Sequence, residues 1–228
     1  MKKKFITILC ILPWLVFADP LNGKMIAEIE RISQMRKQNI ITKSQAIEKL
    51  KECDLKNNIF CTITLGSFYF NTKDYALAYP YLMKSSGIHT VNNKSAASSD
   101  KFLGTMYLYG LGVLADTNKA MKHFKICAAA GNSYCAYHIA IIYSSKYSQI
   151  NNLNDKRNFA KYVYAWMKVT QTLQSLDKDR QLDKASYFKK YHPLQITDHY
   201  KEEHNSKEIS SADELARKIC SSISKCRQ

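Results

Sequence analysis

Two stretches of the chain align with one another without a gap, and each contains a pair of cysteines at the same two positions. The stretches are SQAIEKLKECDLKNNIFC, residues 44–61, and NKAMKHFKICAAAGNSYC, residues 118–135. Each has an alanine in third place, an apolar residue in seventh place, and cysteines in the tenth and eighteenth places. A unit that recurs in this way predicts a repeat protein, in which stacked helical units build an extended surface.

The first eighteen residues predict an export signal that is removed from the mature protein. Lysines at positions 2–4 form a basic segment, residues 5–17 are almost entirely apolar, and Ala18 is a suitable cleavage position. The alternative is an uncleaved anchor, but the apolar run is shorter than the ~20 residues that a membrane-spanning helix requires, and Pro13 interrupts it. We therefore expect a periplasmic or secreted protein with no integral membrane segment after cleavage.

The mature chain is predicted to be strongly basic. The chain has 34 basic residues, and removing the three lysines of the signal leaves 31. With 19 acidic residues, the formal charge of the mature chain is +12. This charge favours acidic protein surfaces or anionic envelope components as partners. The lysines are spread over every segment and no nucleic-acid-binding motif is present, so we expect no nucleic-acid partner.

Six cysteines remain after cleavage, and they form three sequence-local pairs. An even number of cysteines behind a secretory signal predicts disulfides rather than reduced core thiols, and the spacing is too long for a typical zinc site. A straight helix rises ~1.5 Å per residue, so cysteines eight residues apart must lie on either side of a turn. Asn57 and Gly131 are placed to make that turn with a left-handed backbone. The expected bonds are Cys53–Cys61, Cys127–Cys135 and Cys220–Cys226.

Recurring small and aromatic residues predict a series of helix pairs. A Leu-Gly doublet at residues 65–66 returns at 103–104, and Ile139-Ala140 follows it. The glycines, with Ala78 and Ala120 opposite them, are expected to let helices approach closely. Apolar spacing predicts single helices in residues 24–38, from Thr42, and in 159–173, and helix pairs in 61–87 and 95–131. Glycines at 110 and 112 are expected to reverse the chain within the second pair. A polar loop is expected at 144–158. Further helices are expected at residues 178–191 and 193–203, and a last helix with a capping box formed by Ser211 and Glu214.

Residues 103–131, LGTMYLYGLGVLADTNKAMKHFKICAAAG, resemble a Sel-1-like repeat, the relative of the tetratricopeptide repeat with a longer turn between its two helices. Cysteines eight residues apart further resemble the secreted, cysteine-rich bacterial members of that family. The resemblance implies an all-α, right-handed α/α superhelical solenoid with disulfides joining successive repeats. The expected organisation is a signal peptide at 1–18, a solenoid of about three to four helix pairs at 19–176, and a helical cap or tail at 177–228.

Catalytic and metal-binding patterns are sparse. The glycines form neither a dinucleotide-binding nor a phosphate-binding loop, so no cofactor is expected. His199 and His204 have no matching third ligand, so no metal site is expected. Ser-x-x-Lys strings occur at 98–101 and 222–225, and some cysteine-rich members of the resembled family are associated with β-lactam binding or hydrolysis. The Ser-Asp-Asn and Lys-Thr-Gly elements of penicillin-recognising serine enzymes are missing, so this function is the alternative interpretation.

The leading interpretation is an exported, non-enzymatic scaffold that binds a protein or peptide client through a concave helical surface. If the first helix of each pair lines that surface, as in tetratricopeptide relatives, the helical spacing exposes five residues. An equal alternative is that Phe70 and Tyr109 only cover the core at a helix end, because single surface aromatic residues are common. The candidate partner-binding residues are Ser67, Phe70, Thr105, Tyr109 and Ile141.

Overall fold

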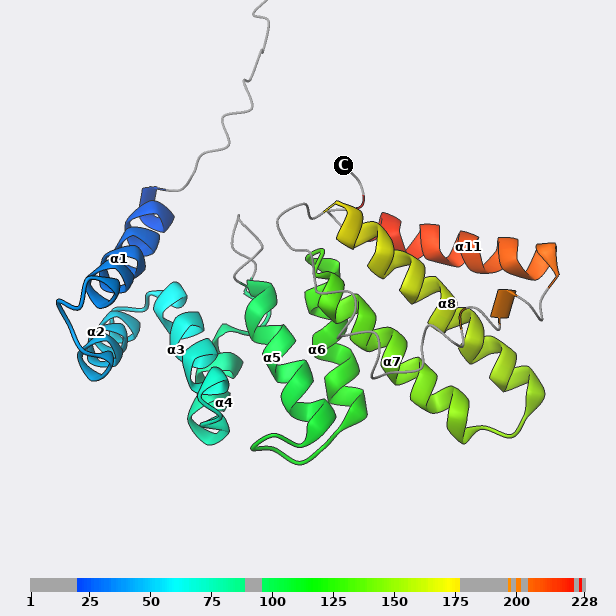
Figure 1. Cartoon of the computed structure of the whole chain (residues 1–228), viewed down its shortest axis with the longest axis horizontal. Helices are drawn as coiled ribbons and strands as arrows, with labels where there is room; N and C mark the ends of the chain where they lie inside the picture. Colours follow the sequence, from blue (N-terminus) through cyan, green and yellow to red (C-terminus); the bar gives the residue numbers. More distant parts are fainter. Residues whose placement is uncertain are drawn as a thin grey trace, which may run out of the picture.

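The structure is a computed structural model that describes residues 20–88, 96–176, 197, 200–201, 205–223 and 226, and this part of the chain is all-α (Figure 1). The predicted signal at 1–18 and the predicted helix at 178–191 lie outside the described residues, as does most of 193–203. None of the described helices is both long enough and apolar enough to cross a bilayer. The helices are α1 (Pro20–Lys37), α2 (Lys43–Leu55), α3 (Ile59–Asn71), α4 (Tyr75–Ser85), α5 (Ala96–Tyr109), α6 (Thr117–Ala129), α7 (Ser133–Gln149), α8 (Leu153–Ser175) and α11 (Ser206–Ser221).

Consecutive helices pack in pairs along the chain, as the sequence predicts. Each helix from α1 to α8 contacts the next, and α1 with α3 and α3 with α5 are also in contact. In Figure 1 the array runs from blue α1 to the yellow end of α8, and red α11 lies beside α8. The buried side chains form two main clusters, one around Leu65, Leu82 and Leu103 and the other around Phe124 and Ile139.

Left-handed residues form the turns between these helices. Asn57 has a φ of 60° and Gly131 a φ of 82°, so both predicted turn residues are confirmed. Gly110 and Gly112, with φ of 67° and 68°, reverse the chain in the longer turn between α5 and α6. A Cβ atom at Gly112 would lie 2.6 Å from the Cβ of Tyr75, so this turn is packed against the start of α4.

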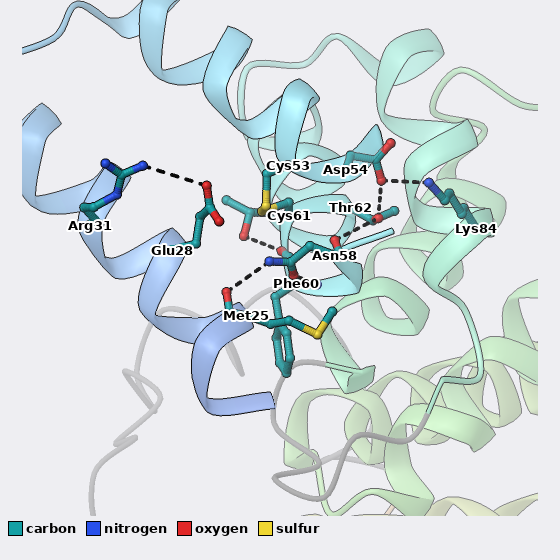
Figure 2. Close-up of a disulfide and its surroundings, with 11 residues drawn as sticks. Met25, Glu28, Arg31, Cys53, Asp54, Asn58, Phe60, Cys61, Thr62 and Lys84 are labelled. Atoms are coloured by element: carbon teal, nitrogen blue, oxygen red, sulfur yellow. Dashed lines mark hydrogen bonds and ion pairs between the residues drawn. A yellow bond between two sulfur atoms is a disulfide. The ribbon is translucent and has the colours of Figure 1, made fainter. Parts of the chain in front are cut away.

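Disulfides close two of the helix pairs. Figure 2 shows the bond between Cys53 of α2 and Cys61 of α3, whose Cα atoms are 6.0 Å apart. Cys127 of α6 and Cys135 of α7 are joined in the same way across 5.9 Å. Each bond lies within one pair of consecutive helices, and the prediction that the bonds join successive repeats is wrong because short turns place both cysteines in one pair. Those turns are residues 56–58 and 130–132. The third expected bond also forms, with Cα atoms 5.5 Å apart, between Cys220 and Cys226.

Polar contacts around the first disulfide attach two further helices to the same junction (Figure 2). The side-chain amide of Asn58 donates to the carbonyl of Met25 in α1 at 3.1 Å. The carboxylate of Asp54 accepts hydrogen bonds from the hydroxyl of Thr62 and, at 2.8 Å, from the ammonium of Lys84 in α4. The α2–α3 pair is thereby fixed to its neighbours on both sides.

Glycine lets two helix pairs approach more closely than any other residue would allow. A Cβ atom at Gly66 in α3 would lie 2.8 Å from Leu82 in α4, and one at Gly104 in α5 would lie 2.7 Å from the ring of Phe124 in α6. Both distances are well below van der Waals contact, so the predicted close approach is confirmed. The alanines predicted on the facing helices are fully buried: Ala78 and Ala120.

The asparagine-rich segment 144–158 is mostly helical, and the prediction of an enlarged loop there is wrong. α7 and α8 are separated only by residues 150–152. The side-chain oxygen of Asn152 accepts hydrogen bonds from the backbone N–H groups of Asn154 and Asp155, at 2.9 and 3.2 Å. Asparagine acts here as the N-cap of α8, which is a helical use of a residue that is also common in loops.

The capping box of α11 lies earlier than predicted. Asn205 and Glu208 form it, because the Asn205 side chain accepts from the N–H of Glu208 at 3.0 Å and the Glu208 side chain accepts from the N–H of Asn205 at 3.3 Å. Ser211, predicted to pair with Glu214, lies inside the helix instead. Its hydroxyl accepts a hydrogen bond from the ammonium of Lys161 at 2.7 Å, which helps to attach α11 to α8.

The close helix approach at Gly104 gives a first test. We expect Gly104→Ala to lower the free energy of unfolding by about 1 to 3 kcal/mol, because the new methyl group would overlap the Phe124 ring. Gly23→Ala in α1 is the matched control, since no atom lies within 4 Å of its Cβ position, and its expected effect is a gain of up to about 1 kcal/mol from helix propensity. Urea denaturation measures both. Equal stability of the two variants would contradict the packing described here.

The first disulfide gives a second test. Replacing both of its cysteines, Cys53→Ala with Cys61→Ala, is expected to lower the free energy of unfolding by about 2 to 3 kcal/mol, because the bond restricts a short loop of the unfolded chain. Urea denaturation of the oxidised proteins compares this variant with the parent chain. An unchanged midpoint and slope would show that the bond does not stabilise the α2–α3 pair.

Candidate binding surface

All five predicted partner-binding residues lie on odd-numbered helices, but most of them are not fully accessible. Ser67 and Phe70 are in α3, Thr105 and Tyr109 are in α5, and Ile141 is in α7. Only Tyr109 is exposed, at 44%, whereas the other four are half-buried. Two of them, Phe70 and Thr105, contact side chains of neighbouring helices that were not among the five.

Phe70 joins α3 to α5 through an aromatic contact. Its ring centroid lies 4.4 Å from that of Phe102 in α5 and 5.5 Å from that of Tyr75 at the start of α4. The side chain therefore belongs partly to the core, and the interpretation that it covers the core is supported for this residue. The ammonium of Lys101 lies 4.3 Å from the Phe102 centroid, a cation–π contact at the edge of the aromatic pair.

A second contact continues the surface from α5 to α7. The hydroxyl oxygens of Thr105 and Tyr134 are 3.3 Å apart, and the Tyr134 ring stacks on His138 with centroids 4.1 Å apart. Phe102 and Tyr134 are the functional candidates that sequence reasoning missed. Phe102 could have been found, because it precedes Thr105 by three residues and Tyr109 by seven, a spacing that places all three on one face of a helix.

We define the odd-helix surface as the side chains that these contacts connect or border. Its members come from three helices and are aromatic, hydroxyl-bearing or aliphatic, with one lysine at the edge. They are Ser67 and Phe70 of α3, Lys101, Phe102, Thr105 and Tyr109 of α5, and Tyr134 and Ile141 of α7.

Charge is distributed unequally between the odd-numbered and the even-numbered helices of this region. α3 contains no charged residue, α5 contains only Asp100 and Lys101, and α7 contains only Lys146. α6 contains no acidic residue but carries three lysines, and all three are exposed: Lys119, Lys122 and Lys125. The odd-helix surface is therefore nearly neutral, and the positive charge lies on other faces.

Two buried ionisable side chains of α5 and α7, Tyr107 and His138, are neutral near pH 7. The hydrogen bond between the hydroxyls of Tyr79 and Tyr107, at 2.7 Å, together with burial, raises the pKa of Tyr107 to about 12. Burial lowers the pKa of His138 to about 4, although its Nδ1–H donates to the carbonyl of Tyr134 at 2.9 Å, which acts in the opposite direction. Neither group adds charge to the surface at neutral pH.

Of the catalytic and metal-binding candidates considered in the sequence, the structure describes Ser98, Lys101 and Ser222. Ser98 and Lys101 are one turn apart in α5, and the Lys101 ammonium lies 4.3 Å from the centroid of the Phe102 ring. His199, His204 and Lys225 lie outside the described residues. Within the described part of the chain, no group of three or more His, Cys, Asp or Glu side chains is arranged to hold a metal ion.

Comparison of the chain with models of protein families, with curated proteins and with solved structures finds no match. The described part of the chain is all-helical, with consecutive helices packed in pairs and with three disulfides.

The buried histidine predicts an acid-sensitive fold. An unfolded histidine has a pKa near 6.5 and His138 in the folded chain has one of about 4, so between these values only the unfolded chain binds the proton. The stabilisation is complete above pH 6.5 and is lost as the pH falls towards 4, by roughly 3 kcal/mol in total. We expect His138→Phe to flatten this part of the stability profile, measured by urea denaturation at pH 7, 6 and 5. Parallel profiles for both proteins would assign the acid sensitivity to other groups.

Proposed function

We propose that the protein is an exported, non-enzymatic scaffold that binds a protein or peptide client through the odd-helix surface. The observation that carries this proposal is the continuity of the surface, in which Phe70 contacts Phe102 and Thr105 contacts Tyr134 across three helices. Half-buried aromatic side chains supply large contact areas at a low cost in side-chain entropy, which suits them to recognising a partner.

The finer architecture is part of this proposal. We infer that the helix pairs form a right-handed α/α superhelix of the Sel-1-like or tetratricopeptide type. Contacts of α3 with both α1 and α5 support it, because alternate helices of a solenoid line a common face.

The compartment follows from the cysteines. Three disulfides favour an oxidising environment outside the cytoplasm, because cytosolic thiols are kept reduced. With the predicted export signal, a periplasmic or secreted location is the one that we propose, in which the protein is able to associate with the cell envelope.

The charge distribution refines the expectation of an acidic client. Because the odd-helix surface is nearly neutral, the residues of a client that contact it directly are expected to be apolar or uncharged polar. The exposed lysines of α6 act at longer range, by attracting a client of net negative charge and raising the rate of association. This division predicts that added salt lowers the association rate and leaves the dissociation rate nearly unchanged.

Tyr109 provides the sharpest test of the surface, because it is exposed and lies on α5. A photo-crosslinking residue at position 109 identifies bound partners in an envelope extract, and the purified partner is then titrated with the full chain. We expect Tyr109→Ala to weaken this binding by at least about tenfold, which is the effect of removing one aromatic contact at an interface.

The matched control is Leu77→Ala, because Leu77 is also a large exposed side chain, at 53%, but lies on the even-numbered helix α4. Its expected effect on binding is less than about twofold. Phe70→Ala is unsuitable as a test, since Phe70 packs against Phe102 and its loss would disturb the fold. Equal effects of the substitutions at 109 and 77, or crosslinking at 77 alone, would remove the odd-helix surface from the proposal.

A further inference from the structure

Helix α4 carries a serine at the position where α2 and α6 carry a disulfide cysteine. In each of these three helices the residue is the eleventh of the helix and follows a small alanine by seven residues. The three pairs of residues are Ala46 and Cys53 in α2, Ala78 and Ser85 in α4, and Ala120 and Cys127 in α6.

Helix α5 carries a serine at the matching position of the odd-numbered helices. In α3, α5 and α7 this residue precedes the doublet of an apolar and a small residue by four positions. Ser85 and Ser99 are both fully buried, and their hydroxyl oxygens are 2.7 Å apart. A hydrogen bond therefore occupies the place of a disulfide between α4 and α5. The three matching residues are Cys61, Ser99 and Cys135.

The other polar contacts at this junction are also non-covalent. The carboxylate of Asp100 in α5, whose side chain is only 1% exposed, accepts hydrogen bonds from the hydroxyl of Ser86 at 2.7 Å and from the N–H of Gly87 at 3.0 Å. His123 Nδ1 of α6 lies 2.8 Å from the same carboxylate. These bonds hold the end of α4 against α5 and α6 with a defined geometry, and they can open without breaking a covalent bond.

We propose that the α4–α5 junction is a hinge between two blocks that are each held by a disulfide. One block contains α2, α3 and α4, joined by Cys53–Cys61 and by the close approach at Gly66. The other contains α5, α6 and α7, joined by Cys127–Cys135 and by the close approach at Gly104. Local opening takes place where no covalent bond opposes it, so the junction held by serines opens before the two held by cysteines.

The hinge would also regulate the odd-helix surface, because the contact between Phe70 of α3 and Phe102 of α5 crosses the junction. Opening separates these rings and divides the surface into two halves, whereas closure makes it continuous. This consequence rests on the proposed function. The hinge itself does not, and its test requires no client.

Thiol labelling measures opening of the junction directly. Ser99→Cys places a buried thiol at the hinge, and Ala136→Cys places one in α7, where the wild-type residue is also fully buried, inside the second block. Both are made in the full-length oxidised protein, with the native disulfides verified by mass mapping. After correction for the global unfolding free energy of each variant, we expect the thiol at 99 to react at least about tenfold faster than the thiol at 136.

A second substitution separates hinge opening from global unfolding. Adding Asp100→Asn removes a charged acceptor at the junction and is expected to raise the labelling rate at 99 several-fold while leaving the rate at 136 unchanged. Equal labelling at the two positions, or acceleration at both, would overturn the hinge. If Ser99→Cys does not fold, amide exchange in the wild-type chain compares Gly87 with Asn57, which are exposed turn residues at the serine and cysteine junctions. Faster exchange at Gly87 supports the hinge, and equal exchange overturns it.

Discussion

The disulfides between α2 and α3 and between α6 and α7 are the constraint on which the rest of the structure depends. Helices of 11 to 17 residues, such as α2 to α7, are marginally stable alone and must bury their apolar faces against neighbours. Each disulfide fixes the meeting point of two of them. The cysteines and their turn residues, Asn57 and Gly131, then leave little freedom in the direction of the following helix. With those directions set, the glycines of α3 and α5 decide how closely the next helix packs.

Much of this arrangement could be predicted from the sequence because it is encoded by residues with few alternative uses. Cysteines eight residues apart require a turn, and glycine is favoured where a Cβ would meet a neighbouring ring. The errors fell on residues with several uses. Asparagine is common in loops, yet Asn152 caps α8, and Ser211 resembles a cap but accepts a hydrogen bond from Lys161 inside α11. Only the tertiary contacts distinguish these possibilities.

For the candidate surface as well, the sequence indicated which helix each residue belongs to but not which residues of other helices it contacts. Helical spacing selected five residues that all lie on odd-numbered helices, but it gave no information on which ring meets which across the array. Phe70 had two equal interpretations, an exposed residue of the surface or a cover over the core. It is half-buried because it packs against Phe102, which comes from a helix that begins 26 residues later in the chain. The near-neutrality of the surface could have been derived from the sequence, since α3 has no charged residue and α5 and α7 have few. The three lysines of the region's even-numbered helix α6 do not belong to the surface.

Equivalent junctions of the array differ in strength, because two are held by a disulfide and the one between α4 and α5 is held by a hydrogen bond between serines. A buried hydrogen bond between Ser85 and Ser99 contributes only about 1 kcal/mol and can form again after each opening. A disulfide excludes that opening for as long as it is oxidised. Asp100 adds both strength and direction, because its buried carboxylate accepts hydrogen bonds from Ser86 and Gly87 and lies 2.8 Å from His123 Nδ1, and these contacts require one arrangement of the helices. A chain with cysteines at all three junctions would present a surface of one fixed curvature. In the hinge that we propose, serines at the central junction would let the two halves of the surface move relative to one another while each half keeps its shape.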